Sequence, residues 1–151
     1  MLGRTYDDQI CSLARALEVV GERWTLLIVR DALLGLCRYE EFSTSLGIAR
    51  NVLTDRLSRL VDAGVLERVR YQRRPDRFEY RLTPMGRALG TPVLALTQWG
   101  DEHLAGPSGP PRLGRHVGCG GEVHAEVCCA RCGERPEADA VHMSPGPGAP
   151  R

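Results

Sequence analysis

The chain has 151 residues, 42% of them hydrophobic and 26% charged, which excludes an intrinsically disordered protein and leaves room for one ordinary domain with a small appendage. No apolar run reaches the roughly 18 residues that a membrane-spanning helix needs, so we expect none. The opening residues MLGRTYDDQI lack the apolar stretch of a signal peptide, and we therefore expect a cytoplasmic protein.

The net charge of +1 conceals a local excess of positive charge. All 20 basic residues are arginine. Residues 49–87 hold ten arginines against five acids, a charge of +5, whereas the rest of the chain holds ten against fourteen, a charge of −4. A concentrated basic region is what a phosphate-binding surface requires.

The first third of the chain predicts three helices. Residues 10–20, ICSLARALEVV, carry apolar side chains at helical spacing. Residues 24–34, WTLLIVRDALL, are apolar on nearly every face except at Arg30 and Asp31, which predicts a helix central to the core. Residues 38–47, RYEEFSTSLG, predict a short helix that ends at its glycine.

A fourth helix and a hairpin follow. Residues 48–64, IARNVLTDRLSRLVDAG, again show helical spacing. Apolar and charged side chains then alternate along residues 65–71 and 78–83, which predicts two strands that turn at Pro75-Asp76. Residues 83–104 predict a long apolar helix, with Thr83 as N-cap, which its internal glycine and proline weaken or kink.

This order of elements is that of a winged helix-turn-helix, a mostly α fold with a small β-hairpin wing. In such a module the second helix of the helix-turn-helix lies in the DNA major groove. Leu53, Leu57 and Leu60 are predicted to face the core. The opposite face then presents Arg50, Asn51, Thr54, Asp55 and Ser58.

The predicted outer face and the hairpin suit double-stranded DNA. Arg50 and Asn51 are of the types that make paired hydrogen bonds to guanine and adenine edges, and the hydroxyls of Thr54 and Ser58 extend that face. The arginines of the wing tip are expected to meet phosphates or to enter the minor groove. These wing residues are Arg73, Arg74 and Arg77.

Two alternatives remain open within this region. An arginine-rich hairpin tip can be only a solvated loop, although its position after a helix-turn-helix favours DNA contact. Arg56 and Arg59 flank the apolar stripe, and either could contact phosphate or pair with an acid such as Glu67.

Three segments carry a family resemblance: GERWTLLI (21–28), LTDRLSRLVDAGVLER (53–68) and EYRLTPMG (79–86). Over residues 8–104 the chain resembles the HxlR family of bacterial transcriptional regulators, which are relatives of MarR. The resemblance implies a winged helix homodimer, paired through its N-terminal and post-wing helices, that binds an inverted-repeat operator and represses. The family usually has a serine shortly before the recognition helix. Ala49 stands there in this chain, which costs the helix an N-cap worth about 1 kcal/mol.

Cys11 is a candidate redox sensor. Some proteins that this chain resembles sense quinones, hypochlorite or disulfide stress through a cysteine ahead of the first helix, and Cys11 stands at the matching position. A thiol near a helix N-terminus has its thiolate favoured by the helix dipole. The alternative is a small apolar residue packed at the dimer interface. Cys37 is interpreted as a packing residue or an exposed bystander.

Composition divides the chain into four parts. Residues 8–104 form the predicted DNA-binding and dimerisation domain, and 105–112 are a linker rich in Gly and Pro. Residues 113–142 form an appendage rich in Cys and His, and 143–151 a disordered tail.

The spacing of the appendage predicts a zinc ribbon-like site. An H-x2-C pair and a C-x2-C pair are separated by nine residues, which suits one structural zinc ion. The segment has few large apolar side chains, so it needs a metal if it is to fold. The predicted ligands are His116, Cys119, Cys129 and Cys132.

Other interpretations of the appendage are kept. Cys128 could replace Cys129 as a ligand, and His124 and His142 are spare candidates. The cysteines could instead form a dithiol switch, or be incidental in a disordered segment.

Rival functions of other classes are a winged helix used only for protein interaction and a metal-dependent enzyme. The local charge of +5 argues against the first. The sequence contains no H-E-x-x-H motif, no paired catalytic carboxylates near the cysteines and no Gly-rich phosphate loop, so we expect no enzyme. An oxidant or small-molecule effector is compatible with the main interpretation.

Overall fold

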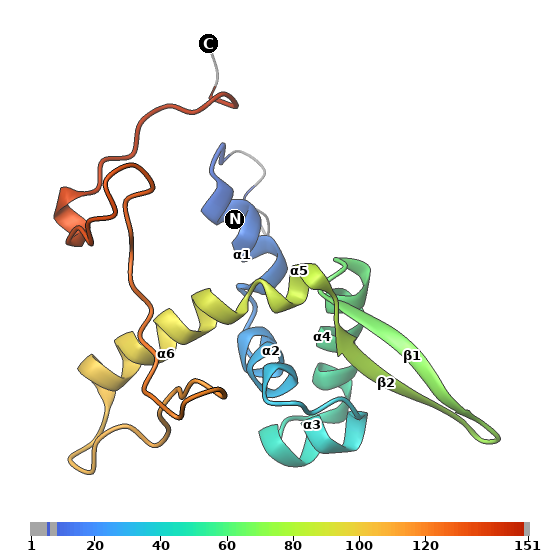
Figure 1. Ribbon diagram of the computed structural model, residues 1–151. Coiled ribbons are helices and arrows are strands. Elements are labelled where there is room, and N and C mark those ends of the chain that lie inside the picture. Colours follow the sequence, from blue (N-terminus) through green and yellow to red (C-terminus); the bar gives the residue numbers. More distant parts are fainter. Residues whose placement is uncertain (1–5, 7–8, 150–151) are drawn as a thin grey trace. The chain divides into compact units, whose positions relative to one another are not determined.

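The computed structural model describes residue 6 and residues 9–149, and the chain divides into two compact units, Met1–Val93 and Leu94–Arg151. The predicted winged helix order is confirmed (Figure 1). The elements are α1 (Ser12–Val20), α2 (Thr25–Leu33), α3 (Tyr39–Leu46), α4 (Arg50–Asp62), β1 (Leu66–Arg73), β2 (Asp76–Leu82), α5 (Pro84–Arg87), α6 (Gly90–Leu104) and a 3-10 turn η1 (Ala138–Ala140). The predicted tail, 143–151, ends in two residues that lie outside the described part.

The core of the first unit lies where α2, α3, α4 and the hairpin base meet. Leu53, Leu57 and Leu60 of α4 are fully buried, as their helical spacing predicts. They pack with Ile28, Val29, Phe42, Ile48, Val65 and Leu66. α3 ends at Gly47, whose φ of +60° is the left-handed conformation that glycine adopts without strain. This tight end fixes the angle at which α4 follows α3.

The helix α2 differs from its prediction on one face. Asp31 was predicted to interrupt an apolar surface, but it is buried, and its Oδ1 accepts hydrogen bonds from Arg30 at 2.7 and 2.9 Å. Leu27, Leu33 and Leu34 are instead partly exposed. The helix is therefore not buried on all sides, and some of its leucines face outward.

The hairpin forms with a different turn from the predicted one. Arg73 pairs with Asp76, so the turn consists of Arg74 and Pro75 and Asp76 already belongs to β2. The prediction of a turn at Pro75-Asp76 was wrong by one residue, because Asp76 is already paired with Arg73. A bulge at Tyr71 shifts the register between Arg70 and Gln72. Figure 1 shows the two strands projecting from the helices of this unit as a long ribbon.

A single backbone bridge at Arg38 anchors the ribbon to the helices. The backbone N–H of Tyr80 donates to the carbonyl of Cys37 at 2.7 Å, and Arg38 forms a bridge with Glu79. Glu79 is 8% exposed and accepts a hydrogen bond from Arg81 at 2.8 Å, with Arg38 at 3.5 Å. The hydrogen bond from Arg81 holds the pKa of Glu79 below its ordinary value. The base of the wing is thus held by charge pairing as well as by backbone hydrogen bonds.

The predicted long helix after the wing is two helices. Thr83 caps α5 as predicted, its Oγ1 accepting from the N–H of Gly86 at 3.1 Å. The chain then turns, and α6 begins at Gly90. Pro92 lies in the first turn of α6, where its missing N–H costs no helical hydrogen bond.

Gly86 lies against the backbone of Val65, the residue that precedes β1. A Cβ at this position would lie 2.1 Å from the carbonyl oxygen of Val65. The same carbonyl accepts a hydrogen bond from the N–H of Thr83 at 3.1 Å. The close approach of α5 to Val65 therefore depends on the absence of a side chain at Gly86.

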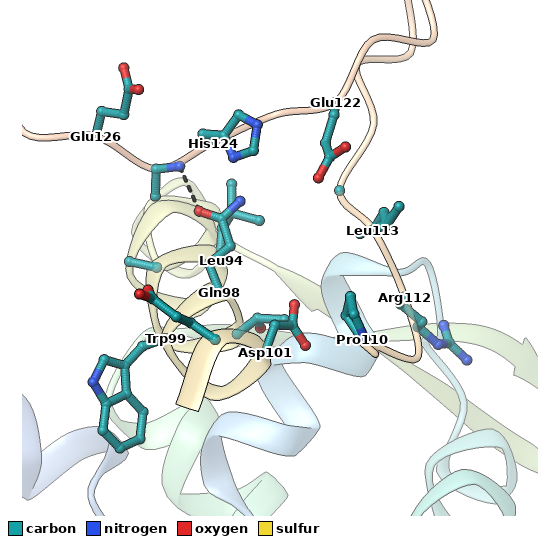
Figure 2. Close-up of a pocket in the computed structure, with 15 residues that line it drawn as sticks. Leu94, Gln98, Trp99, Asp101, Pro110, Arg112, Leu113, Glu122, His124 and Glu126 are labelled. Atoms are coloured by element: carbon teal, nitrogen blue, oxygen red, sulfur yellow. Dashed lines mark hydrogen bonds between the residues drawn. The ribbon is translucent and has the colours of Figure 1, made fainter. Parts of the chain in front are cut away.

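The second unit contains a small hairpin held on α6. The N–H of His116 donates to Gly121 at 2.8 Å, and the N–H of Val123 donates to Gly114 at 2.9 Å. The side-chain amide of Gln98 donates to Val123 at 2.6 Å and accepts from Ala125 at 2.8 Å, as Figure 2 shows for the second bond. The Gln98 amide thus both donates to and accepts from the backbone of this segment, as the backbone of an adjacent β-strand would.

Candidate nucleic-acid interface

The outer face of α4, which the sequence predicts to contact DNA bases, is exposed. Arg50, Asn51, Thr54 and Ser58 all lie on the solvent side of α4, opposite its buried leucines. Ala49 is the N-cap residue and makes no side-chain cap hydrogen bond, as expected from the missing hydroxyl. The first N–H groups of α4 therefore have no side-chain partner from the cap, and they lie beside the predicted DNA contacts.

Arg50 is held by neighbours that the sequence did not indicate. Its guanidinium lies 2.7 Å from Glu40 and 5.7 Å from the ring centre of Tyr39. The Tyr39 hydroxyl donates to the Arg50 carbonyl at 3.0 Å, and the Thr54 hydroxyl donates to the same carbonyl at 2.9 Å. The start of α4 is thereby fixed to α3. No sequence pattern could identify Glu40, because its contact with Arg50 depends on how the two helices cross.

Arg56 and Arg59 pair with acids other than Glu67. The side chain of Arg56 is 15% exposed and binds Glu22 at 2.7 Å, the carbonyl of Arg23 at 3.2 Å, and Asp55. Arg59 lies 3.1 Å from Asp55 and 3.8 Å from Glu22. Arg56 thus ties α4 to the connection between α1 and α2, and its charge is already neutralised.

The wing arginines are free of such pairing. Arg73, Arg74 and Arg77 are exposed, and none of the ion pairs within the described part of the chain involves them. Further down the ribbon, Arg70 lies 3.5 Å from Asp76, and Arg68 lies 3.6 Å from the ring centre of Phe78. Three arginines without an acidic partner among the described residues therefore lie together at the tip, where Asp76 is the one acid and is paired with Arg70.

The two isolated cysteines have opposite environments. Cys11 is exposed at the N-cap of α1, where the nearby backbone N–H groups of Ala14 and Leu13 lower the pKa of its thiol. Cys37 is half-buried, and desolvation together with the nearby Glu79 carboxylate raises the pKa of its thiol. Cys11 therefore carries more thiolate at neutral pH than Cys37.

The four predicted metal ligands lie in two separate turns. His116 Nδ1 is 3.1 Å from Cys119 Sγ. Cys129 and Cys132 share the second turn, where the N–H groups of Cys132 and Arg131 lower the pKa of the Cys129 thiol. In the described residues no three His, Cys, Asp or Glu side chains form one metal-binding group.

A half-open pocket of about 620 Å³ lies in the second unit, between α6 and residues 110–126 (Figure 2). Its lining includes four acids and one arginine, Arg112. The acidic residues are Asp101, Glu102, Glu122 and Glu126. Carboxylates outnumber the single arginine in this lining, so the candidate nucleic-acid surface remains that of the winged helix unit.

Comparisons with known proteins agree with this geometry. A family model described as HxlR-like helix-turn-helix matches residues 19–107. The uncharacterized HTH-type transcriptional regulator Rv3095 of Mycobacterium tuberculosis is 48% identical over 137 residues, which cover 91% of this chain and 87% of the relative. YvaP of Bacillus subtilis, also an uncharacterized HTH-type transcriptional regulator, is 34% identical over 60% of this chain and 84% of its own.

Solved structures give the same result. PA1607, named as a proposed transcription factor, superposes with a TM-score of 0.81 and 38% identity, covering 89% of this chain and 94% of its own. The redox regulator HypR in its oxidized form gives a TM-score of 0.58 and 30% identity, covering 64% of this chain and all of its own. These relatives are regulators and not enzymes, as expected for this chain. Within the part of the chain that the structure describes, no helix is long and apolar enough to cross a membrane.

The family match spans more than half of the chain, and the structure has the winged helix order of elements. The chain belongs to the HxlR family of winged helix-turn-helix transcriptional regulators.

Proposed function

We propose that the protein represses transcription as a homodimer bound to an inverted-repeat operator. The observation that carries this proposal is the position of the unneutralised charge. The wing-tip arginines have no acidic partner among the described residues, whereas Arg56 and Arg59 are paired. An exposed polar helix face next to an unpaired basic ribbon fits base contacts by α4 and phosphate contacts by the wing.

The base contacts are assigned to Arg50 and Asn51, with Thr54 and Ser58 beside them. Arg50 is bound to Glu40, but both side chains are about three-quarters exposed. An exposed ion pair contributes about 0–1 kcal/mol. Exchanging Glu40 for a guanine edge or a phosphate therefore costs Arg50 little.

Dimerisation is supported by apolar side chains that this chain leaves uncovered. Leu13 and Leu17 are exposed on α1. Within the described residues of α6 none is buried, and Leu96, Trp99 and Leu104 are each more than half exposed. Exposed aliphatic and aromatic side chains on helices flanking a winged helix are suited to a two-fold interface.

A redox or electrophile input at Cys11 is the finer part of the proposal. The thiol is exposed, and the N–H groups at the start of α1 favour its thiolate. A redox regulator, HypR, is among the structural neighbours. Oxidation that joins the Cys11 sulfur to a second thiol as a disulfide, with two electrons and two protons passing to the oxidant, would alter the same helix that the proposed dimer uses and would link thiol chemistry to DNA binding.

Footprinting tests the proposal. The purified protein is incubated with the DNA upstream of its own gene, with and without diamide, and protected bases are mapped. We expect two protected half-sites about one helical turn apart, as two-fold binding of a dimer requires. We also expect diamide to release the wild-type protein but not Cys11→Ser. A single unpaired protected site would contradict the dimeric operator, and release of both proteins by diamide would contradict the role of Cys11.

A further inference from the structure

The C-terminal segment contains two turns with the same backbone pattern. In the first turn, the N–H of His116 donates to Gly121 at 2.8 Å and the N–H of Gly120 returns to the His116 carbonyl at 2.7 Å. Gly120 has a φ of +72°. A glycine in this conformation lets the chain reverse directly after Cys119 without strain.

The second turn repeats each of these features. The N–H of Cys129 donates to Glu134 at 2.8 Å, and the N–H of Gly133 returns to the Cys129 carbonyl at 2.9 Å. Gly133 follows Cys132 and has a φ of +75°. Each turn thus carries a possible metal ligand at its first and fourth positions and a left-handed glycine at its fifth.

This pattern brings the ligand atoms of each pair together. His116 Nδ1 and Cys119 Sγ are 3.1 Å apart. Two ligands of one tetrahedral zinc ion, with bonds of about 2.0 Å to nitrogen and 2.3 Å to sulfur, lie about 3.5 Å apart. The first pair therefore needs to open only slightly to accept an ion. The second pair, Cys129 and Cys132, occupies the equivalent first and fourth positions of its turn.

We propose that the two turns are the two halves of one structural zinc site, with ligands His116, Cys119, Cys129 and Cys132. Two thiolate-bearing turns of this kind facing one ion form a closed tetrahedral site with no position for substrate. The structure does not gather the four side chains into one group, so closure requires the chain between the turns to bend. The segment that follows the first turn is held on α6, because Gln98 hydrogen-bonds to the backbone of Val123 and Ala125. The bend must therefore occur in residues 126–128, which connect this segment to the second turn.

The same geometry distinguishes Cys129 from its neighbour. The thiol of Cys128 points to the carbonyl of Gly133 at 3.5 Å and to that of Cys129 at 3.8 Å. The Cys128 thiol therefore donates to backbone carbonyls of the turn, whereas Cys129 and Cys132 are the two proposed zinc ligands of this turn. Substitution of Cys128 is a matched control for substitution of Cys129, because both residues are cysteines and they are adjacent in the chain.

The segment also belongs to the part of the chain that relatives share. It lies outside the family model, which ends at residue 107. The match to Rv3095 covers 137 of the 151 residues, so at most 14 lie outside it and residues 15–137 must be included. Both turns fall within that range.

Metal analysis of the full chain tests the proposal. The protein is purified reduced and without chelator, and its zinc content is measured directly and after addition of Zn²⁺ or Co²⁺. Wild type, Cys128→Ser and His124→Asn should each bind about one ion per chain. Cys129→Ser and His116→Asn should bind zinc more than about tenfold more weakly, since losing even an outer partner of a metal site costs that much.

Cobalt absorption supplies a readout of the ligands themselves. The bound ion should show the bands of a tetrahedral site with thiolate ligands, and the winged helix unit should keep its circular dichroism in every variant. Failure of the reduced wild type to bind added Zn²⁺ or Co²⁺ would overturn the proposal. Equal metal binding by Cys128→Ser and Cys129→Ser, or one ion per two chains, would overturn the assigned site as well.

Discussion

The guanidinium of Arg50 on α4 lies 2.7 Å from the carboxylate of Glu40 on α3, so the arginine proposed to read DNA is already paired with an acid. Both side chains are exposed, and water and salt weaken their attraction. Glu40 is therefore a weak competitor with DNA for Arg50. It also holds the side chain near the start of α4 in the absence of DNA.

Removing this competitor should tighten DNA binding. We expect Glu40→Gln to raise operator affinity by up to about fivefold, which corresponds to the 0–1 kcal/mol of an exposed pair. Arg50→Ala should lose about 1–3 kcal/mol and relax sequence preference. Fluorescence anisotropy with operator and scrambled duplexes measures both effects.

A double variant separates pairing from net charge. If Glu40 acts through Arg50, Glu40→Gln should have little effect when Arg50 is already alanine. An equal gain in affinity in both backgrounds would show that Glu40 acts only as a distant negative charge.

Gly86 should tolerate no side chain. A Cβ there would meet the Val65 carbonyl at 2.1 Å, so Gly86→Ala should lower the free energy of unfolding by about 1–3 kcal/mol. Gly90→Ala is the matched control, because its Cβ would meet only the Leu33 side chain at an ordinary 3.7 Å. Urea denaturation at one fixed protein concentration measures both. Equal stability of the two variants would contradict the close approach of α5 to Val65.

The sequence could predict the elements because their patterns are local. The spacing of Leu53, Leu57 and Leu60 identifies the buried side of α4 without any tertiary information. The turn of the wing was misplaced by one residue, because alternation alone does not set which residues of the two strands pair.

Side-chain partners from distant elements could not be predicted. Arg56 binds Glu22, 34 residues earlier in the chain, and the sequence offered Glu67 as an equally good acid. Asp31 resembled an exposed residue because a carboxylate is costly to bury, but the adjacent Arg30 provides two hydrogen bonds to its Oδ1. Such pairings depend on how the helices cross, which one sequence does not specify.

The two isolated cysteines should react at different rates. The lowered pKa of Cys11 gives it more thiolate at neutral pH, whereas the raised pKa of Cys37 leaves it protonated there. Iodoacetamide should therefore modify Cys11 first, and the difference should shrink as the pH rises above the pKa of Cys37. Mass spectrometry of peptides over a pH series measures this. Faster labelling of Cys37 at neutral pH would contradict the two environments.

Dimerisation should depend on the exposed leucines of α1. Leu13 is 67% exposed, and replacing it with glutamate would place a charge in the proposed apolar interface. We expect Leu13→Glu to sediment as a monomer at concentrations where wild type is a dimer. Arg15→Gln, an exposed change on the same helix, should remain dimeric. A monomeric wild type at micromolar concentration would refute the interface and the palindromic operator together.

The wing should contribute affinity without sequence preference. Replacing Arg73, Arg74 and Arg77 with alanine should weaken operator and random duplexes alike, because phosphate contacts carry no base information. Arg131→Ala, in the C-terminal segment, is the control for loss of surface charge and should leave binding unchanged. A selective loss of operator binding would show that the wing reads bases.

Salt dependence of DNA binding tests recognition by α4 and the wing together. Affinity for operator and scrambled duplexes is determined over a salt series for wild type and the triple wing variant. We expect both proteins to prefer the operator, and the slope of log affinity against log salt to be shallower in the variant by about two to three units, at about 0.9 per phosphate contact. Equal affinity of wild type for both duplexes, or an identical salt slope in the two proteins, would contradict DNA recognition by α4 and the wing.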